Sequence, residues 1–150
     1  MSIIARSLSV AFLILTLTGC GGKGDPSHVS MSGTVTLNGE PLADAQVTFI
    51  PTGDTQGIGA GAWTGPDGRY QLIDRRGQPG TQPGTYKVTI SKRLMPDGSE
   101  VPVDDKRPSI ESPARESLPP NYSDSARTEL QAVVPEQGGT VDFPLKVRVK

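Results

Sequence analysis

The sequence predicts an all-β protein, a seven-stranded antiparallel β-sandwich with Greek-key connections. Short segments in which apolar and polar residues alternate recur along the chain, as expected of strands with one buried face. Turn-forming residues separate these segments. The 150 residues include 18 glycines and 14 prolines, and no segment carries a long helical repeat, which excludes a helical bundle.

The first predicted strand covers residues 29–37, where apolar residues alternate with serine and threonine. Asn38-Gly39 follows, a pair that accepts positive φ angles, so we expect a hairpin or a close corner there. Pro41 then interrupts the pairing. The alternation resumes in a second strand with Ala45, Val47 and Phe49 on its apolar face.

Three further strands are predicted in the middle of the chain. A glycine-rich loop over 51–61 leads to a short strand over 62–64, and residues 65–68 form a tight turn. Tyr70 and Leu72 then point to one side. After a loop over 74–83, the clearest strand of the chain places three side chains inward, namely Tyr86, Val88 and Ile90.

The last two predicted strands cover residues 130–134 and 141–149. Pro144 cannot donate to a ladder, so it indicates an edge or a bulge. Between the two groups of strands, residues 93–126 contain six prolines and mixed charges, which predicts a long insert that is functional or disordered. Leu118 and Tyr122 are candidates to pin part of it to one end of the sandwich.

Four segments in this order and spacing resemble the carboxypeptidase regulatory-like domain: 33–42, 45–49, 65–70 and 83–90. The resemblance covers residues 29 to about 147 and is weakest through the insert. It implies a transthyretin-like (prealbumin-like) sandwich, a fold that is non-catalytic in some metallocarboxypeptidases. With the segment 118–124 and the start of the chain, the whole sequence is similar to small exported bacterial lipoproteins.

The start of the chain has the three parts of an export signal. Arg6 precedes the apolar stretch 8–17, and small residues follow. Leu17-Thr18-Gly19-Cys20 resembles the lipobox of bacterial lipoprotein precursors, which implies cleavage between Gly19 and Cys20 and acylation of Cys20 by fatty acids such as palmitate. An ordinary secretory signal is the alternative. We therefore expect a signal peptide over 1–19, a tether over 20–28 and the domain over 29–150.

The net charge and the expected lipid indicate how the protein is attached to a membrane. The net charge of −1 leaves no footprint for nucleic acid, so the lipid on Cys20 is the expected link to a membrane. Gly21 lacks the aspartate that retains some lipoproteins at the inner membrane, which favours the outer membrane. The partner expected there is an unidentified protein or polysaccharide of the envelope.

Residues for catalysis are scarce in this chain. The one histidine, His28, lies in the expected tether, and the one cysteine is the expected lipidation site, so no zinc site or nucleophilic relay is predicted and no metal or cofactor. Asp104-Asp105 fits solvated loop charges. Asp67 and Asp97 precede glycines and are expected to form turns rather than a calcium site.

We therefore expect no enzyme, but a lipid-anchored module that interacts with another envelope protein. Carbohydrate binding is the alternative, and a transthyretin-like hydrolase is a remote one. Trp63 and Tyr122 are the possible ligand contacts, because Tyr70 and Tyr86 fit the core pattern. Anchoring roles are the competing interpretation for both.

Overall fold

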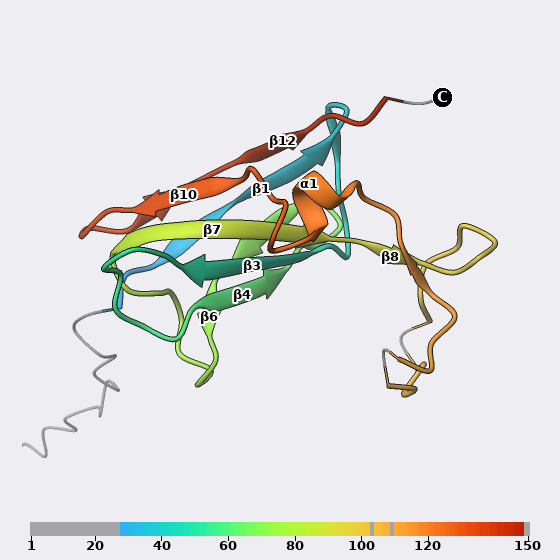
Figure 1. The fold of residues 1–150 in the computed structure, drawn as a ribbon, viewed down its shortest axis with the longest axis horizontal. Coiled ribbons are helices and arrows are strands. Elements are labelled where there is room, and N and C mark those ends of the chain that lie inside the picture. Colours follow the sequence, from blue (N-terminus) through green and yellow to red (C-terminus); the bar gives the residue numbers. More distant parts are fainter. Residues whose placement is uncertain (1–27, 103, 109, 149–150) are drawn as a thin grey trace, which may run out of the picture.

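The computed structural model describes residues 28–102, 104–108 and 110–148. Nearly all of its regular structure is β-strand, which confirms the all-β class (Figure 1). The strands are β1 (Met31–Leu37), β2 (Glu40–Pro41), β3 (Gln46–Pro51), β4 (Ala60–Trp63), β5 (Arg69–Gln71), β6 (Ile73–Asp74), β7 (Gly84–Ser91), β8 (Arg93–Leu94), β9 (Arg115–Glu116), β10 (Gln131–Val134), β11 (Gly139–Thr140) and β12 (Phe143–Leu145); the helix is α1 (Pro120–Ser123). The described part of the chain has no helix with the length and hydropathy needed to cross a bilayer.

The first sheet is built around β1. Ser32 of β1 pairs in parallel with Thr140 of β11 and antiparallel with Gln71 of β5. Further along β1, β12 also pairs with it in parallel, and β2 pairs with it antiparallel. An entirely antiparallel sandwich is therefore wrong for this sheet. The reason is that β10 lies in the other sheet, so the chain crosses over and enters beside β1 in the same direction, as parallel pairing requires (Figure 1).

The second sheet has the order β10-β7-β3-β4-β6 and is antiparallel throughout. Its strands β7 and β3 are the longest pair, with six residues in register. Predicted strand positions agree with β3, β7 and β10 within a few residues, whereas β4 begins two residues earlier than expected. Thus the alternating pattern located β3, β4, β7 and β10 of this sheet, although neither β6 nor the order of the strands.

Side chains from both sheets meet in one core. The ring of Phe49 on β3 lies 6.5 Å from that of Tyr70 on β5 and 6.2 Å from that of Phe143 on β12. Within its own sheet it lies 5.7 Å from the ring of Tyr86. Such offset and edge-on pairs add to the burial of the rings. The predicted inward residues Tyr86, Val88 and Ile90 are fully buried.

The expected turns and corners are present. Asn38 and Gly39 have φ angles of 52° and 94° and join β1 to β2 in a two-residue hairpin loop. In the turn at 65–68, the carboxylate of Asp67 accepts a hydrogen bond from the backbone N–H of Arg69. In a separate turn, the carboxylate of Asp97 accepts one from the backbone N–H of Ser99. Both aspartates are therefore turn formers, as predicted. Pro144 lies on β12, an edge strand, which is also as predicted.

The last strand is shorter than the expected 141–149. It divides into β11 and β12, because the carboxylate of Asp142 accepts the backbone N–H of Thr34 at 2.8 Å in place of a ladder carbonyl. The insert, in contrast, has more regular structure than the sequence predicted. It contains the pair β8 and β9 and the helix α1, and Leu118 is buried in the core. The expected pinning by Leu118 and Tyr122 is confirmed.

Candidate functional site

Trp63 ends β4 and is a large aromatic residue on the surface of the described chain. Its side chain is 66% exposed, so an anchoring role in the core is excluded. Trp63 pairs with Gln46 of β3, and Gln46 pairs on its other side with Ser91 of β7. Residues that pair directly across strands point to the same face. The three side chains therefore form a row on the outer face of the second sheet.

The insert forms a wall beside this row. Between them lies a hollow of about 630 Å³. Its lining comes from the ends of β3, β4 and β7 and from the insert: Asp44, Gln46, Trp63, Ser91, Lys92, Arg93, Glu100, Val101, Asp105, Arg107, Ser112 and Ala114. Figure 1 shows β8 and the rest of the insert projecting from the end of the sandwich at which β4 and β7 finish. We call this hollow the insert groove.

Hydrogen bonds to Glu116 and from Lys92 hold the insert against the sandwich. The carboxylate of Glu116 accepts the backbone N–H of Lys92 at 3.1 Å and that of Leu118 at 2.9 Å, and it also accepts the hydroxyl of Ser91. The buried ammonium of Lys92 donates to the carbonyl of Ala43 at 2.8 Å and to Glu100 at 3.0 Å. A buried ammonium needs such partners. The wall of the groove is therefore attached at several points.

The expectation that Asp105 is a solvated loop charge is wrong. Its carboxylate is nearly buried and accepts two hydrogen bonds from the guanidinium of Arg107, at 2.7 and 2.8 Å. These bonds, together with one from the backbone N–H of Arg107, hold the pKa of Asp105 below its ordinary value. The reason for the error is local: the carboxylate of Asp105 accepts the backbone N–H of Arg107 at 3.1 Å, which holds the chain so that the guanidinium of Arg107 also reaches it.

A second hollow of about 570 Å³ lies on the other side of Trp63. It is lined by Ser32, Gly33, Thr34, Trp63, Arg69, Tyr70, Gln71, Thr140 and Asp142. We call it the sheet hollow, because most of these residues belong to β1 and β5. Burial, reinforced by the charge of Asp142, raises the pKa of the Tyr70 hydroxyl, which donates a 2.7 Å hydrogen bond to the carbonyl of Val141. Tyr70 is thus a neutral donor fixed within the fold.

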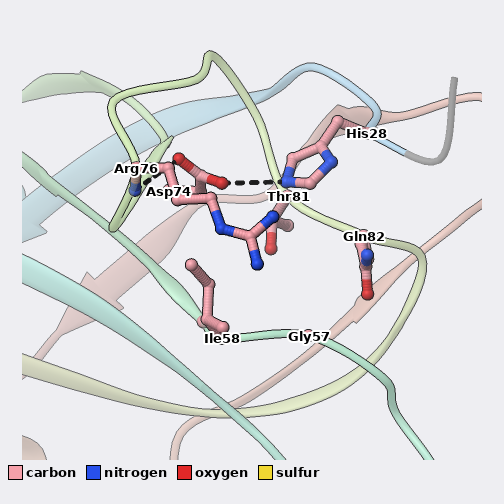
Figure 2. Close-up of a pocket in the computed structure, with 8 residues that line it drawn as sticks. His28, Gly57, Ile58, Asp74, Arg76, Thr81 and Gln82 are labelled. Carbon is pink, nitrogen blue, oxygen red and sulfur yellow. Dashed lines mark hydrogen bonds and ion pairs between the residues drawn. The ribbon is translucent and has the colours of Figure 1, made fainter. Parts of the chain in front are cut away.

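His28 and Asp74 form an ion pair at the start of the described chain, and the expectation that the histidine lies outside the fold is wrong. Figure 2 shows the two side chains facing each other, with Nε2 of His28 3.2 Å from Oδ2 of Asp74. The cause is backbone pairing of Val29 with Thr81, which brings His28 to the turn after β6. There the backbone N–H groups of Gln78 and Arg76, followed by His28, lower the pKa of Asp74.

The space at this pair is small. The hollow bordered by His28, Asp74 and Thr81 measures about 30 Å³, and Figure 2 shows the Arg76 side chain reaching into it. That volume holds about one or two water molecules. The hydroxyl of Thr81 is buried and lies 3.1 Å from that of Tyr86. The pair therefore has the geometry of a structural contact. Among the described residues, no three His, Cys, Asp or Glu side chains are grouped as metal ligands.

The other predicted site residues have mixed outcomes. Gly19 and Cys20 lie outside the described residues. The hydroxyl of Tyr122 on α1 donates to the carbonyl of Lys146 at 3.1 Å and accepts from its N–H at 3.3 Å, while its ring packs on the core. Tyr122 thus anchors the chain after β12 and borders neither hollow beside Trp63. Core packing and these bonds favour the anchoring interpretation of Tyr122, and its role as a ligand contact stays a prediction.

Sequence reasoning missed several residues of the insert groove. The alternation did place Ser91 outward, and the same pattern applied to β3 would have found Gln46 between buried Ala45 and Val47. Lys92 gave no such signal. Its acceptors lie at Ala43 and Glu100, which only the tertiary structure brings together.

Comparison with known proteins adds little to this description. No family model matches the chain. No curated protein matches it either. Among solved structures it is similar to that of a DUF3823 family protein from Parabacteroides merdae, with a TM-score of 0.38 and 16% sequence identity. The match covers 81% of this chain and 46% of that chain, so this chain spans less than half of the other protein. At that level the similarity supports no argument about function.

Proposed function

We propose that this protein is a non-catalytic, lipid-anchored protein of the cell envelope that binds another envelope molecule at its insert groove. The observation that carries the proposal is the 66% exposure of Trp63 between two hollows. Exposed aromatic side chains beside concave, partly polar surfaces are typical of binding sites. The attachment of the insert by Glu116 and Lys92 supports a preformed groove.

The finer fold assignment is part of the same proposal. A transthyretin-like Greek-key sandwich of the carboxypeptidase regulatory-like kind agrees with the four sequence segments and with two sheets that share a core. Folds of this kind serve as scaffolds for many binding surfaces. The hydrolase alternative has less support, because the hollow beside His28 and Asp74 is too small for a substrate.

The lipid anchor is supported by the motif Leu17-Thr18-Gly19-Cys20. Mass spectrometry of the native amino terminus should find Cys20 as the first residue, with acyl chains on its sulfur. Cys20→Ala should move the protein from the membrane fraction to the soluble fraction, whereas Gly22→Ala should not, and outer-membrane fractions should hold most of the native protein. A native protein that keeps residues 1–19 or has a bare thiol would exclude the anchor.

Binding at the insert groove can be tested in intact cells. A photo-crosslinking amino acid at Ser112, in the groove wall, should give specific adducts. The same amino acid at Val133 is the control, since Val133 is exposed on β10 at the opposite edge of the second sheet. Trp63→Ala should abolish the Ser112 adducts. Equal adducts at both positions, or adducts that persist without Trp63, would argue against the proposed groove.

A further inference from the structure

The position of Trp63 between the insert groove and the sheet hollow indicates how long a ligand the surface fits. The hollows measure about 630 and 570 Å³. Trp63 is the residue that lines both. A ligand that extends from one hollow to the other would contact Trp63, which favours a chain molecule over a compact one.

The charged residues of the insert groove limit which kind of ligand it can bind. The insert groove has three basic residues, Lys92, Arg93 and Arg107, and three acidic ones, Asp44, Glu100 and Asp105. Four of these six charges form two direct pairs: Lys92 lies 3.0 Å from Glu100, and Arg107 lies 2.7 Å from Asp105. An anionic or cationic ligand would have to compete with these pairs, whereas a neutral ligand leaves them intact.

The sheet hollow is also balanced in charge. It holds one base, Arg69, and one acid, Asp142. Arg69 lies 3.6 Å from Asp67, and Asp142 accepts the N–H of Thr34. Beside Tyr70, whose hydroxyl is already bonded to Val141, the other polar side chains that line it are uncharged donors and acceptors: Ser32, Thr34, Gln71 and Thr140. Such groups match a ligand with many hydroxyl groups.

The row on the second sheet completes this match. Gln46 pairs with Trp63 on the neighbouring strand, about 5 Å away, so an amide that both donates and accepts projects from the same face as the indole. An exposed indole presents an apolar face on which the C–H face of a sugar ring can stack, and its N–H remains available as a donor. Stacking and uncharged hydrogen bonds together are the chemistry that recognises sugars.

We propose that the surface binds a neutral polysaccharide chain that crosses Trp63 from the insert groove to the sheet hollow. This inference rests on the proposed function, of which it names the ligand class. Affinity should therefore rise with chain length until both hollows are filled. A proline-rich peptide could also stack on an indole, but a peptide chain brings backbone donors and charged termini rather than a dense set of hydroxyls.

Intrinsic fluorescence tests the proposal directly, since Trp63 is the only tryptophan of the chain. Purified protein would be titrated with glucose-based and mannose-based neutral oligosaccharides, from monosaccharide to hexasaccharide. The expected result is a shift of the emission with at least one series, and an affinity that increases with length before it levels off. Acidic oligosaccharides and proline-rich peptides form the comparison arms.

Calorimetry with variants then assigns the site. Trp63→Ala should weaken binding of the longest oligosaccharide at least about tenfold, as loss of a central aromatic contact does. Gln46→Ala should weaken it less, and Val133→Ala, at the far edge of the sheet, should leave it unchanged. Circular dichroism checks that each variant is folded, so that lost binding is not mistaken for unfolding.

The outcomes separate this inference from the proposed function. Binding confined to acidic oligosaccharides or to peptides, with loss in Trp63→Ala, overturns the neutral polysaccharide and leaves the groove as a binding site. A flat fluorescence response to every neutral oligosaccharide also overturns it. Failure of the proposed function would be seen elsewhere, in crosslinking at Ser112 that does not depend on Trp63 or in native protein without lipid on Cys20.

Discussion

Asp74 is a carboxylate whose ionised form the fold stabilises. It is buried and accepts backbone N–H groups of Gln78 and Arg76, each at 2.8 Å, in addition to the ion pair with His28. These partners lower its pKa in the folded state. A lowered folded pKa means that Asp74 contributes stability above its unfolded pKa of about 3.9, and that this contribution is lost as the pH falls through the folded value.

We therefore predict that Asp74→Asn lowers the free energy of unfolding at neutral pH. The difference from the native chain should shrink as the pH falls below about 4 and should vanish once Asp74 itself is protonated. Urea denaturation across this pH range measures it. Asp54→Asn, in an exposed loop, is the control and should show little difference at any pH. A difference for Asp74→Asn that is independent of pH would contradict the explanation.

Gly33 shows a second effect at the scale of one residue, a close approach of two strands. A Cβ atom at this position would lie 1.7 Å from the carbonyl oxygen of Val141 and 2.8 Å from the Tyr70 hydroxyl. The φ angle of Gly33 is not in the left-handed region, so the constraint is steric alone. The parallel crossing of residues 139–145 beside β1 thus depends on the absence of a side chain at Gly33.

We predict that Gly33→Ala destabilises the fold by about 3 kcal/mol or more, because backbone must move to admit the methyl group. Gly61→Ala is the matched control. It is also a strand glycine, but its added Cβ would meet the carbonyl of Val47 at 3.2 Å, so its effect should stay within about 1 kcal/mol. Thermal or urea denaturation compares them. Equal effects would show that the approach of Val141 is not the constraint.

At the scale of elements, the insert is held by a few polar contacts. Glu116 of β9 links the end of β7 to the segment before α1, through hydrogen bonds to Ser91, Lys92 and Leu118. Most of the insert beyond these contacts is exposed. A segment attached in this way can open locally while the core stays folded.

We predict that Glu116→Ala increases hydrogen exchange across residues 93–117 and leaves β3 and β7 protected. Global stability should fall by only about 1 kcal/mol, because water replaces the bonds of an exposed carboxylate. Glu111→Ala, an exposed glutamate of the same insert, should change neither quantity. Uniform loss of protection in the sandwich would show instead that the insert and the core unfold together.

Elements differ in how well sequence predicts them. Strand alternation located β1, β3, β7 and β10, because the period of two reflects burial of one face and is local. It did not predict the parallel pairing of β12 with β1, which depends on the crossover from the second sheet. Proline content suggested a structureless insert, but the pair β8–β9 closes it through residue pairs 23 and 21 positions apart.

At the scale of the whole molecule, the described chain begins at one end of the sandwich and the insert projects from the other (Figure 1). His28 and the loop after β6 lie at the starting end, where Val29 pairs with Thr81. If Cys20 anchors the protein, the insert should face away from the membrane.

This arrangement predicts the depth of labels in membrane-bound protein. A fluorophore on Arg75→Cys, near the start of the described chain, should be quenched by a headgroup quencher more than one on Ser112→Cys in the insert groove. An acylated Cys20 has no thiol, so each introduced cysteine is labelled alone. Both labels should lose quenching in Cys20→Ala. Stronger quenching at Ser112 would place the groove against the membrane and contradict the orientation.

Local features of the sequence determined the all-β class, most strand positions, the turns at Asn38-Gly39 and Asp67-Gly68, and Trp63 as a surface candidate. These follow from burial of alternate side chains and from backbone preferences, which act over a few residues. The tertiary structure alone decided that His28 meets Asp74 and that Lys92 and Glu116 place the insert beside Trp63. Each of those contacts joins residues more than twenty positions apart, where no local pattern specifies the partner.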